Sequence, residues 1–160
     1  MVTIRECKTE DIKTILSWNE STEAFLKQWS NFTYPLAEEQ YIDRINSEDF
    51  YVFSIEHDGT LAGTVQIYRT DKEKRTARVG CYLINPQMRG KGIGTSALDL
   101  LSAYAFKNME VDTLESSVFD YNVGAIKCYQ KVGFVKTGEF QHPMGWTGYT
   151  MSKSSARRIE

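Results

Sequence analysis

Three glycines at alternate positions, Gly90, Gly92 and Gly94, stand between a segment with the alternation of a strand and a longer segment with the spacing of a helix. Glycine lacks a Cβ atom and tolerates positive φ, so successive backbone amides in such a turn can converge on an anion at the positive end of the helix. A turn that only reverses the chain is the alternative. The arrangement favours a concavity that accommodates a pyrophosphate.

The spacing of the glycines distinguishes this turn from common phosphate-binding turns. A Walker loop ends in Gly-Lys-Ser/Thr, whereas Lys91 is followed here by Gly92. The dinucleotide fingerprint Gly-x-Gly-x-x-Gly needs a longer last gap than the one between Gly92 and Gly94. Both patterns match poorly, so neither a P-loop nor a Rossmann fold is predicted.

Hydrophobic periodicity divides the rest of the chain into helical and extended segments. Short links between the first strands after residue 50 favour an antiparallel meander. In the last of these, Ala77, Val79, Cys81 and Leu83 alternate as side chains on one face of a strand do. The expected strands cover 2–6, 50–56, 61–68, 77–83, 113–119, 134–140 and 146–151, and the expected helices 9–16, 23–28, 37–45, 93–105 and 122–132.

Two motifs in this order carry a resemblance to a known family. Arg89 to Gly94 reads Arg-Gly-Lys-Gly-Ile-Gly, and it matches the Arg/Gln-x-x-Gly-x-Gly/Ala signature of the GCN5-related N-acetyltransferase superfamily. The chain resembles that superfamily from its first strand to Met151. The segments 82–86 and 122–134 are similar to the branch that contains the ribosomal-protein N-terminal acetyltransferases.

The resemblance implies a fold and a reaction. The fold class is α+β, with a mostly antiparallel central sheet that splays between its fourth and fifth strands and is flanked by helices. A single acetyltransferase domain is expected over residues 1–152, followed by a short polar tail at 153–160. The implied reaction is direct transfer of an acetyl group from acetyl-CoA, the cosubstrate, to a primary amine of a small molecule or a protein N-terminus.

The resemblance also implies roles for individual residues. Tyr129 would protonate the departing sulfur, and a backbone amide near Ile84 would contact the developing oxyanion. Asn122 and Tyr129 lie seven residues apart, which places both on the same side of a helix. The expected coenzyme A contacts are Tyr82, Leu83, Ile84, Arg89, Gly90, Lys91, Gly92, Ile93, Gly94, Thr95, Asn122 and Tyr129.

The base that deprotonates the amine is less clearly marked. Many family members carry a glutamate five residues before the asparagine, but Ser117 occupies that position here. Glu115 lies two residues earlier, on the same face of the strand, and is a substitute candidate for a catalytic role. The alternatives are that Glu115 is a solvated surface carboxylate and that deprotonation runs through water. Without the glutamate, a noncatalytic acyl-CoA-binding sensor or interaction module is the alternative function.

Two groups of residues near the N-terminus could shape an acceptor site. Trp18, Trp29, Phe32 and Tyr34 could line the acceptor entrance, although aromatic residues near helices more often belong to a core. The acidic residues of 38–43 could attract a cationic acceptor, or they could form a solvated helix face.

Composition limits the remaining possibilities. A formal net charge of −2 gives no basic footprint for general nucleic-acid binding. No apolar run of membrane-spanning or signal-peptide length occurs, so we expect a cytoplasmic protein without membrane contact. As a separate expectation, the protein is a monomer or a homodimer. The three cysteines are far apart and the two histidines lack partners at metal-binding spacing, so neither disulfides nor a metal site is expected.

Overall fold

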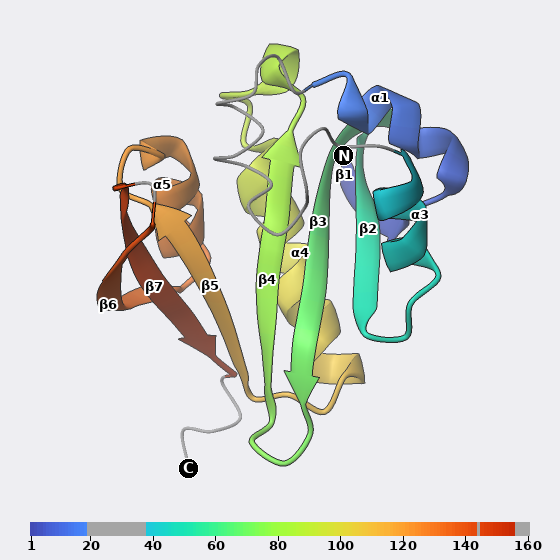
Figure 1. Ribbon diagram of the computed structural model, residues 1–160. Coiled ribbons are helices and arrows are strands. Elements are labelled where there is room, and N and C mark those ends of the chain that lie inside the picture. Colours follow the sequence, from blue (N-terminus) through green and yellow to red (C-terminus); the bar gives the residue numbers. More distant parts are fainter. Residues whose placement is uncertain (19–37, 144, 156–160) are drawn as a thin grey trace.

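The computed structural model describes residues 1–18, 38–143 and 145–155 of the chain (Figure 1). The expected helix over 23–28 lies outside these residues. The order of elements otherwise follows the hydrophobic periodicity. The described elements are β1 (Val2–Glu6), η1 (Thr9–Asp11), α1 (Ile12–Leu16), α3 (Glu38–Ile45), β2 (Phe50–His57), β3 (Thr60–Asp71), β4 (Thr76–Ile84), η2 (Pro86–Met88), α4 (Ile93–Asn108), β5 (Thr113–Phe119), α5 (Val123–Lys131), β6 (Val135–Gln141) and β7 (Thr147–Ser154).

The described strands form one sheet in the order β1-β2-β3-β4-β5-β7-β6. Neighbouring strands are antiparallel except β4 and β5, which are parallel. Pairing between these two strands runs only from Thr76↔Thr113 to Val79↔Ser116. Both strands continue beyond that point, and Figure 1 shows them diverging. The predicted α+β fold, with a mostly antiparallel sheet splayed between its fourth and fifth strands, is confirmed.

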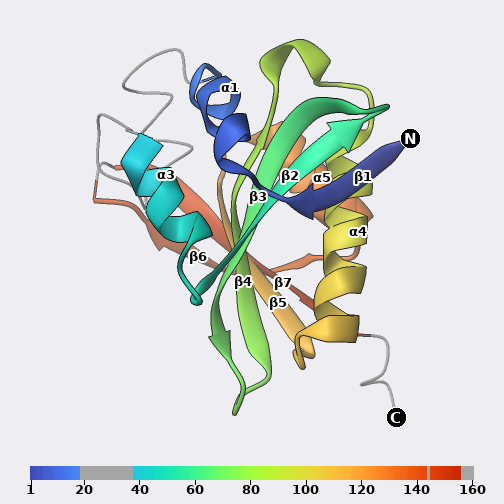
Figure 2. The same ribbon diagram turned by 90° about the vertical axis from the view of Figure 1, so that its right-hand side faces the viewer.

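Helices cover both faces of the sheet (Figure 2). α4 and α5 pack on one face, where Leu98, Leu101 and Tyr129 join a large buried cluster with residues of β2 to β5. α1 and α3 lie on the other face, where Ile12, Ile15 and other side chains form a second, smaller cluster. Because the middle of the sheet is covered twice, its central strands bury side chains on both faces.

β4 changes faces partway along its length, which corrects the expectation of one alternating face. Gln66 of β3 pairs with Gly80 but Thr64 pairs with Leu83, so β4 carries one extra residue in this interval, a β-bulge. Cys81 adopts φ +49° there. Before the bulge Ala77 and Val79 belong to the cluster under α4, whereas after it Cys81 and Leu83 belong to the cluster under α1 and α3.

The C-terminal strand is longer than expected. β7 runs to Ser154, and its last residue pairs with Thr113 of β5. The strand therefore continues two residues into the segment 153–160 that was expected to be a tail. No helix among the described residues is long and apolar enough to cross a membrane.

A buried carboxylate connects β1 to the turn before α1. Asp11 is 7% exposed and accepts hydrogen bonds from Arg5 Nη1 and Nη2 at 2.7 and 3.0 Å, from Ser54 Oγ at 2.9 Å and from the Lys8 amide at 2.9 Å. These donors stabilise the ionised form. The hydrogen bonds from Arg5 contribute most and lower the pKa of Asp11 to about 2, against the opposing effect of burial.

We predict that Asp11→Asn lowers the free energy of unfolding by about 2 kcal/mol at neutral pH, since the depressed pKa measures how strongly the fold prefers the carboxylate. Because the pKa of Asp11 is lower in the folded protein than in the unfolded chain, its carboxylate stabilises the fold fully above the unfolded pKa of about 4. That stabilisation is lost as the pH falls towards the folded pKa of about 2. Urea unfolding at several pH values therefore should show the gap between wild type and variant narrowing across that window. Asp99→Asn, at an exposed position of α4, is the matched control. An equal loss for both variants, or a gap that does not depend on pH, would contradict the role of Asp11.

Candidate functional site

A cavity of about 590 Å³ lies where the end of β4, the glycine turn and α5 meet. We call it the glycine-turn cavity. Its lining contains every predicted coenzyme A contact except Lys91 and Tyr129. The lining residues are Tyr82, Leu83, Ile84, Met88, Arg89, Gly90, Gly92, Ile93, Gly94, Thr95, Tyr121, Asn122, Val123, Gly124, Ala125, Lys127, Cys128 and Lys131.

The three glycines serve different purposes. Gly90 and Gly92 have φ of +80° and +78°, and a Cβ atom on either would meet nothing within 4 Å. Gly92 is also the N-cap of α4, so the first free amides of the helix follow it. A Cβ atom on Gly94 would instead lie 1.8 Å from the hydroxyl oxygen of Tyr82. Gly90 and Gly92 therefore leave open space beside the backbone, while Gly94 lets α4 approach β4.

Basic side chains stand around this cavity. Arg89 lines it and donates from Nε to the carbonyl oxygen of Ile84 at 3.3 Å. Lys127 and Lys131, one helical turn apart on α5, line it as well. Neither lysine was predicted as a site residue, although their spacing on the expected helix was the available signal. The cavity combines free helical amides, positive φ and cations, which suits a diphosphate.

Two predicted contacts, Lys91 and Thr95, differ in where their side chains lie. Lys91 is exposed and does not line the cavity. Thr95 lines it, but its hydroxyl donates to Cys128 Sγ at 3.3 Å, which connects α4 to α5.

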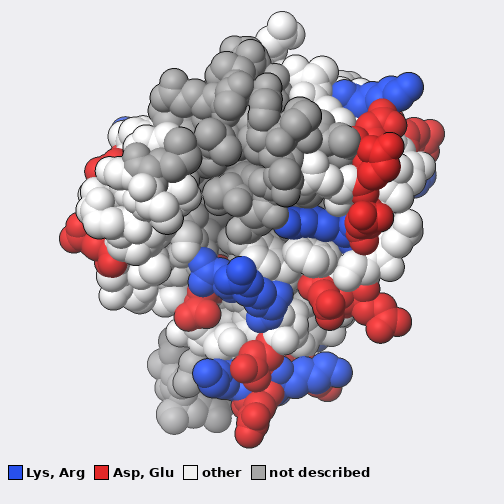
Figure 3. Space-filling model, viewed as in Figure 1, with Lys and Arg blue, Asp and Glu red and all other residues white. Residues whose placement is uncertain are grey.

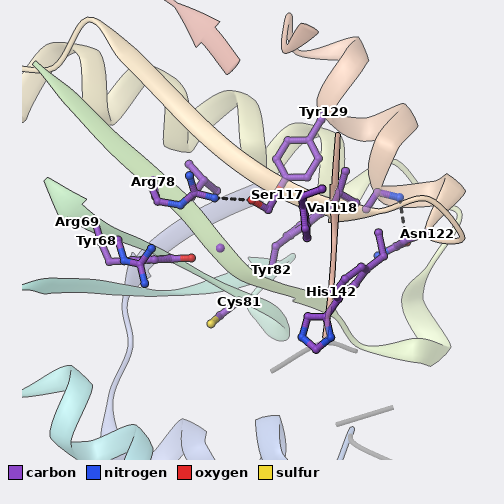
Figure 4. A pocket seen from close by; sticks show the side chains of 15 residues that line it. Tyr68, Arg69, Arg78, Cys81, Tyr82, Ser117, Val118, Asn122, Tyr129 and His142 are labelled. Carbon is purple, nitrogen blue, oxygen red and sulfur yellow. Dashed lines mark hydrogen bonds between the residues drawn. The ribbon is translucent and has the colours of Figure 1, made fainter. Parts of the chain in front are cut away.

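A second cavity, of about 260 Å³, lies between the diverging strands β4 and β5 (Figure 4). We call it the inter-strand cavity. Side chains from β3, β4, β5, α5 and β6 surround it. The lining residues are Tyr68, Arg69, Arg78, Val79, Gly80, Cys81, Tyr82, Ser117, Val118, Phe119, Asn122, Ala125, Tyr129, Phe140 and His142.

Asn122 and Tyr129 are brought together as their spacing predicted. Both line the inter-strand cavity, and Asn122 also caps α5 by accepting a hydrogen bond from the Ala125 amide at 3.3 Å. Tyr129 is 3% exposed and its ring meets that of Tyr82 edge-on at 5.9 Å. Burial raises the pKa of Tyr129, and the Ser116 hydroxyl acts in the opposite direction. Its phenol is therefore neutral near pH 7 and has a proton to donate.

The two cavities meet. Tyr82, Asn122 and Ala125 line both of them, so a ligand that extends from one cavity reaches residues of the other. Ile84, the predicted oxyanion contact, lines the glycine-turn cavity on the part of β4 that no longer pairs with β5. Backbone groups on that side of β4 are free of the sheet and can bind a ligand.

Glu115 lies outside both linings. Its residue is exposed on β5, and its register partner on β4 is Arg78, within the paired part of the two strands. The structure thus places Glu115 towards the closed end of the sheet, which agrees with the alternative of a surface carboxylate. Ser117 does line the inter-strand cavity and accepts a hydrogen bond from Arg78 Nη2 at 2.5 Å (Figure 4).

Two arginines and a histidine of the inter-strand cavity were not predicted as site residues. Arg69, Arg78 and His142 all line it, and they come from β3, β4 and the residue after β6. No sequence pattern marks Arg69 and Arg78, since their convergence depends on strand register. His142 lies between the strands expected at 134–140 and 146–151 and outside the motifs that carry the resemblance, so the sequence did not point to it for this site.

The expected N-terminal acceptor residues are only partly described. Trp18 packs against the cluster under α1 and α3, as a core residue does. Trp29, Phe32 and Tyr34 lie outside the described residues. The acidic residues of α3 line neither cavity. Among the described residues, no group of three or more His, Cys, Asp or Glu side chains could hold a metal ion.

The known proteins that this chain resembles are acetyltransferases. The family model described as the acetyltransferase (GNAT) family matches residues 13–134. The probable N-acetyltransferase YjcK of Bacillus subtilis (strain 168) is 32% identical over 102 residues, which are 62% of this chain and 56% of that protein. The chain therefore matches little more than half the length of this relative. Spermidine N(1)-acetyltransferase of Escherichia coli (strain K12) is 28% identical over 144 residues, 88% of this chain and 76% of that protein.

A solved structure shares the whole fold. The crystal structure of spermidine N-acetyltransferase from Vibrio cholerae, in complex with CoA and spermine, superposes with a TM-score of 0.82. The match covers 99% of this chain and 98% of that chain, at 21% sequence identity. This likeness shows the arrangement of the strands and helices.

We predict that Gly92→Glu removes binding of coenzyme A, weakening it at least about 100-fold, because a carboxylate would enter the space beside the free amides of α4 and repel phosphate. Isothermal titration calorimetry with coenzyme A measures the effect. Gly59→Glu is a matched control: Gly59 also has positive φ, +83°, and open space within 4 Å, but it lies outside both cavities. Unchanged affinity in Gly92→Glu, or equal loss in both variants, would contradict the placement of the diphosphate.

Proposed function

The chain belongs to the acetyltransferase (GNAT) family, and we propose that it transfers the acetyl group of acetyl-CoA directly to a primary amine of a small molecule. The observation that carries this proposal is the meeting of the two cavities at Tyr82, Asn122 and Ala125. One cavity has the groups that suit the phosphates of coenzyme A, and the other leaves a separate space for the acceptor.

The chemistry requires an uncharged amine. Its nitrogen attacks the carbonyl carbon of the thioester, a C–N bond forms, the C–S bond breaks, and coenzyme A departs as a thiolate that takes up a proton. The attacking nitrogen loses one proton. A backbone amide near Ile84, on the part of β4 free of β5, would donate to the carbonyl oxygen as negative charge develops there.

Tyr129 is proposed as the proton donor to the departing sulfur. Its position in α5 puts the phenol at the inter-strand cavity, and burial keeps the phenol protonated. An unperturbed thiol has a pKa of about 8.5 and tyrosine of about 10, so full proton transfer is uphill by a pKa difference of about 1.5. Burial of Tyr129 raises its pKa and increases that difference. A positioned phenol can still stabilise developing thiolate charge by a hydrogen bond.

The proton from the amine has no carboxylate to take it among the described lining residues of the inter-strand cavity. Glu115 lines neither cavity, so its position does not support a role as the base. We propose that water relays this proton. Acetylation would then depend on the fraction of acceptor that is uncharged in solution and rise with pH up to the pKa of the amine.

Two acceptor classes fit the volume. The relatives named for spermidine support a small-molecule amine. A cavity of about 260 Å³ also admits the terminal residue of a peptide, the acceptor implied by the resemblance to the ribosomal-protein branch. The small molecule is preferred because the cavity is narrow, lying between strands rather than along an open groove.

We expect coenzyme A to be released when acetyl-CoA is mixed with a broad panel of primary amines and peptide N-termini, at a rate above hydrolysis without acceptor. A thiol-detecting assay measures release, and mass spectrometry identifies the acetylated product. Binding of acetyl-CoA without release across the whole panel would instead favour the noncatalytic sensor.

We predict that Tyr129→Phe lowers kcat about 100-fold while the Kd for coenzyme A changes less than about threefold, because the change removes a proton donor and leaves the packing of the ring. The control is Tyr41→Phe, which removes another buried hydroxyl, bonded to Thr64 Oγ1 at 2.7 Å and outside the lining of both cavities. It should lower stability and leave kcat in place. A wild-type kcat in Tyr129→Phe would refute the acid role.

A further inference from the structure

The inter-strand cavity is lined by positive charge without a matching negative charge. Arg78 and Arg69 both contribute, and the described lining residues include no Asp or Glu. Neither arginine forms an ion pair with a described residue, whereas Arg5 and Arg75 each do. Figure 3 shows basic side chains gathered near the middle of the face on which β4 and β5 diverge.

Arg78 is aimed along the cavity by its hydrogen bond. Its register partner on β5 is Glu115, but its guanidinium donates to Ser117, two residues further towards the splayed end. Two residues of strand correspond to about 7 Å. The charge of Arg78 therefore lies beyond its own Cα position, nearer to Tyr82 and the junction of the two cavities, and away from the closed end where Glu115 lies.

Arg69 is directed by an irregularity in β3. Pairing shifts between Tyr68↔Arg78 and Asp71↔Thr76, so β3 carries an extra residue in this interval, and Arg69 has φ +51°. A bulge re-aims side chains. The guanidinium carbon lies 5.7 Å from the centre of the Tyr68 ring, on the same cavity wall as Arg78 (Figure 4). Arg69 is exposed and Arg78 half-buried, so Arg78 is the less screened charge.

From this geometry we propose that the acceptor amine also carries an oxyanion, a carboxylate or a phosphate, which Arg78 binds with help from Arg69. The inference rests on the proposed transfer of acetyl to an amine. Arginine presents paired donors that match carboxylate and phosphate oxygens. A cleft lined by one sign of charge concentrates ligands of the opposite sign, and a second cation beside two guanidinium groups would be repelled. A polyamine would bring that second cation.

The position of Arg78 also limits the length of the acceptor. The amine must reach the junction at Tyr82, and the guanidinium is bonded to Ser117, the first residue of β5 past the last pair, Val79↔Ser116. Continuing that register by one residue would set Ser117 opposite Gly80, two residues before Tyr82. The amine and the oxyanion should then be separated by roughly 7 Å, or less where the guanidinium reaches forward. Short amino acids with a terminal amine meet this requirement.

Matched acceptor pairs test the proposal. β-Alanine and γ-aminobutyrate are each compared with propylamine and butylamine, O-phosphoethanolamine is compared with ethanolamine, and spermidine represents the polycations. Coenzyme A release gives kcat/KM for each. We expect at least one anionic member to exceed its neutral partner by about tenfold or more, since a hydrogen bond to a charged group contributes a factor of about 10 to 100. A carboxylate pair and the phosphate pair distinguish the two anions.

Variants then assign the preference to the arginines. Arg78→Gln should raise KM for the preferred anionic acceptor about 10- to 100-fold with little change for the neutral amine, and Arg69→Gln should have a smaller effect in the same direction. Ser117→Glu should act like Arg78→Gln, because a carboxylate at that position would pair with Arg78. Lys72→Gln removes the same charge from the exposed turn between β3 and β4 and is the control.

The outcomes separate this inference from the proposed function. Release with neutral amines or spermidine but no advantage for any anionic partner overturns the oxyanion site and leaves the acetyltransferase activity intact. An anionic preference that Arg78→Gln and Ser117→Glu do not reduce also overturns it. As a readout independent of turnover, calorimetry of succinate and of inorganic phosphate into the protein loaded with coenzyme A should show binding of at least one anion that Arg78→Gln weakens, and equal binding in both proteins counts against the proposal.

Discussion

The extra residue in β4 is the constraint on which both cavities depend. A regular strand would keep Ala77, Val79, Cys81 and Leu83 on one face and would go on pairing with β5 along its length. With the bulge, pairing with β5 ends at Val79↔Ser116 and the strand turns its other set of side chains towards α4 and α5. Cys81 bears the cost of positive φ, about 1 kcal/mol for a residue with a Cβ atom. In return, the backbone of β4 beyond Cys81 does not pair with β5 and can bind a ligand.

Because the side chains of β4 change faces at Cys81, this one strand lines both the inter-strand cavity and the glycine-turn cavity. Before the bulge, alternation places Arg78 on the face opposite Ala77 and Val79, where α1 and α3 lie. After it, Tyr82 turns towards α4, where the absence of a Cβ atom on Gly94 lets the helix pack against its hydroxyl. The donor side and the acceptor side of the sheet are therefore connected through the gap beside β4, and Tyr129 reaches that gap from α5.

The features that sequence predicted are those encoded locally. Gly90 and Gly92 show the positive φ that their turn required, and Asn122 and Tyr129 line the same cavity, as their spacing on a helix required. The mostly antiparallel sheet and its splay came from the family resemblance. The bulge could not be predicted, because Ala77, Val79, Cys81 and Leu83 are all buried and the alternation of burial is unbroken. The change of face shows only in the structure, in the pairing with β3 and in the two clusters to which these side chains belong.

Sequence alone also could not show that Glu115, a candidate for a catalytic role, lies outside both cavities. Sequence alternation correctly put Glu115 and Ser117 on one face of β5, but it could not tell where along that strand the sheet opens. The opening begins after Ser116, so Ser117 lies in the cavity and Glu115 does not. Arg69 and Arg78 were missed for a related reason, since their approach depends on registers set by bulges in two different strands.

The residue at position 117 connects the missing carboxylate to the charge of the acceptor cavity. A glutamate there, as in many members of the family, would offer a base and would also neutralise Arg78. Serine accepts the hydrogen bond from Arg78 Nη2 without carrying a charge, so it holds the guanidinium in place with its positive charge intact. One substitution thus removes a group that binds cationic amines and leaves a group that binds anions. The fold that presents acetyl-CoA need not change for the preferred acceptor to do so, since specificity depends on a few side chains added to a common frame.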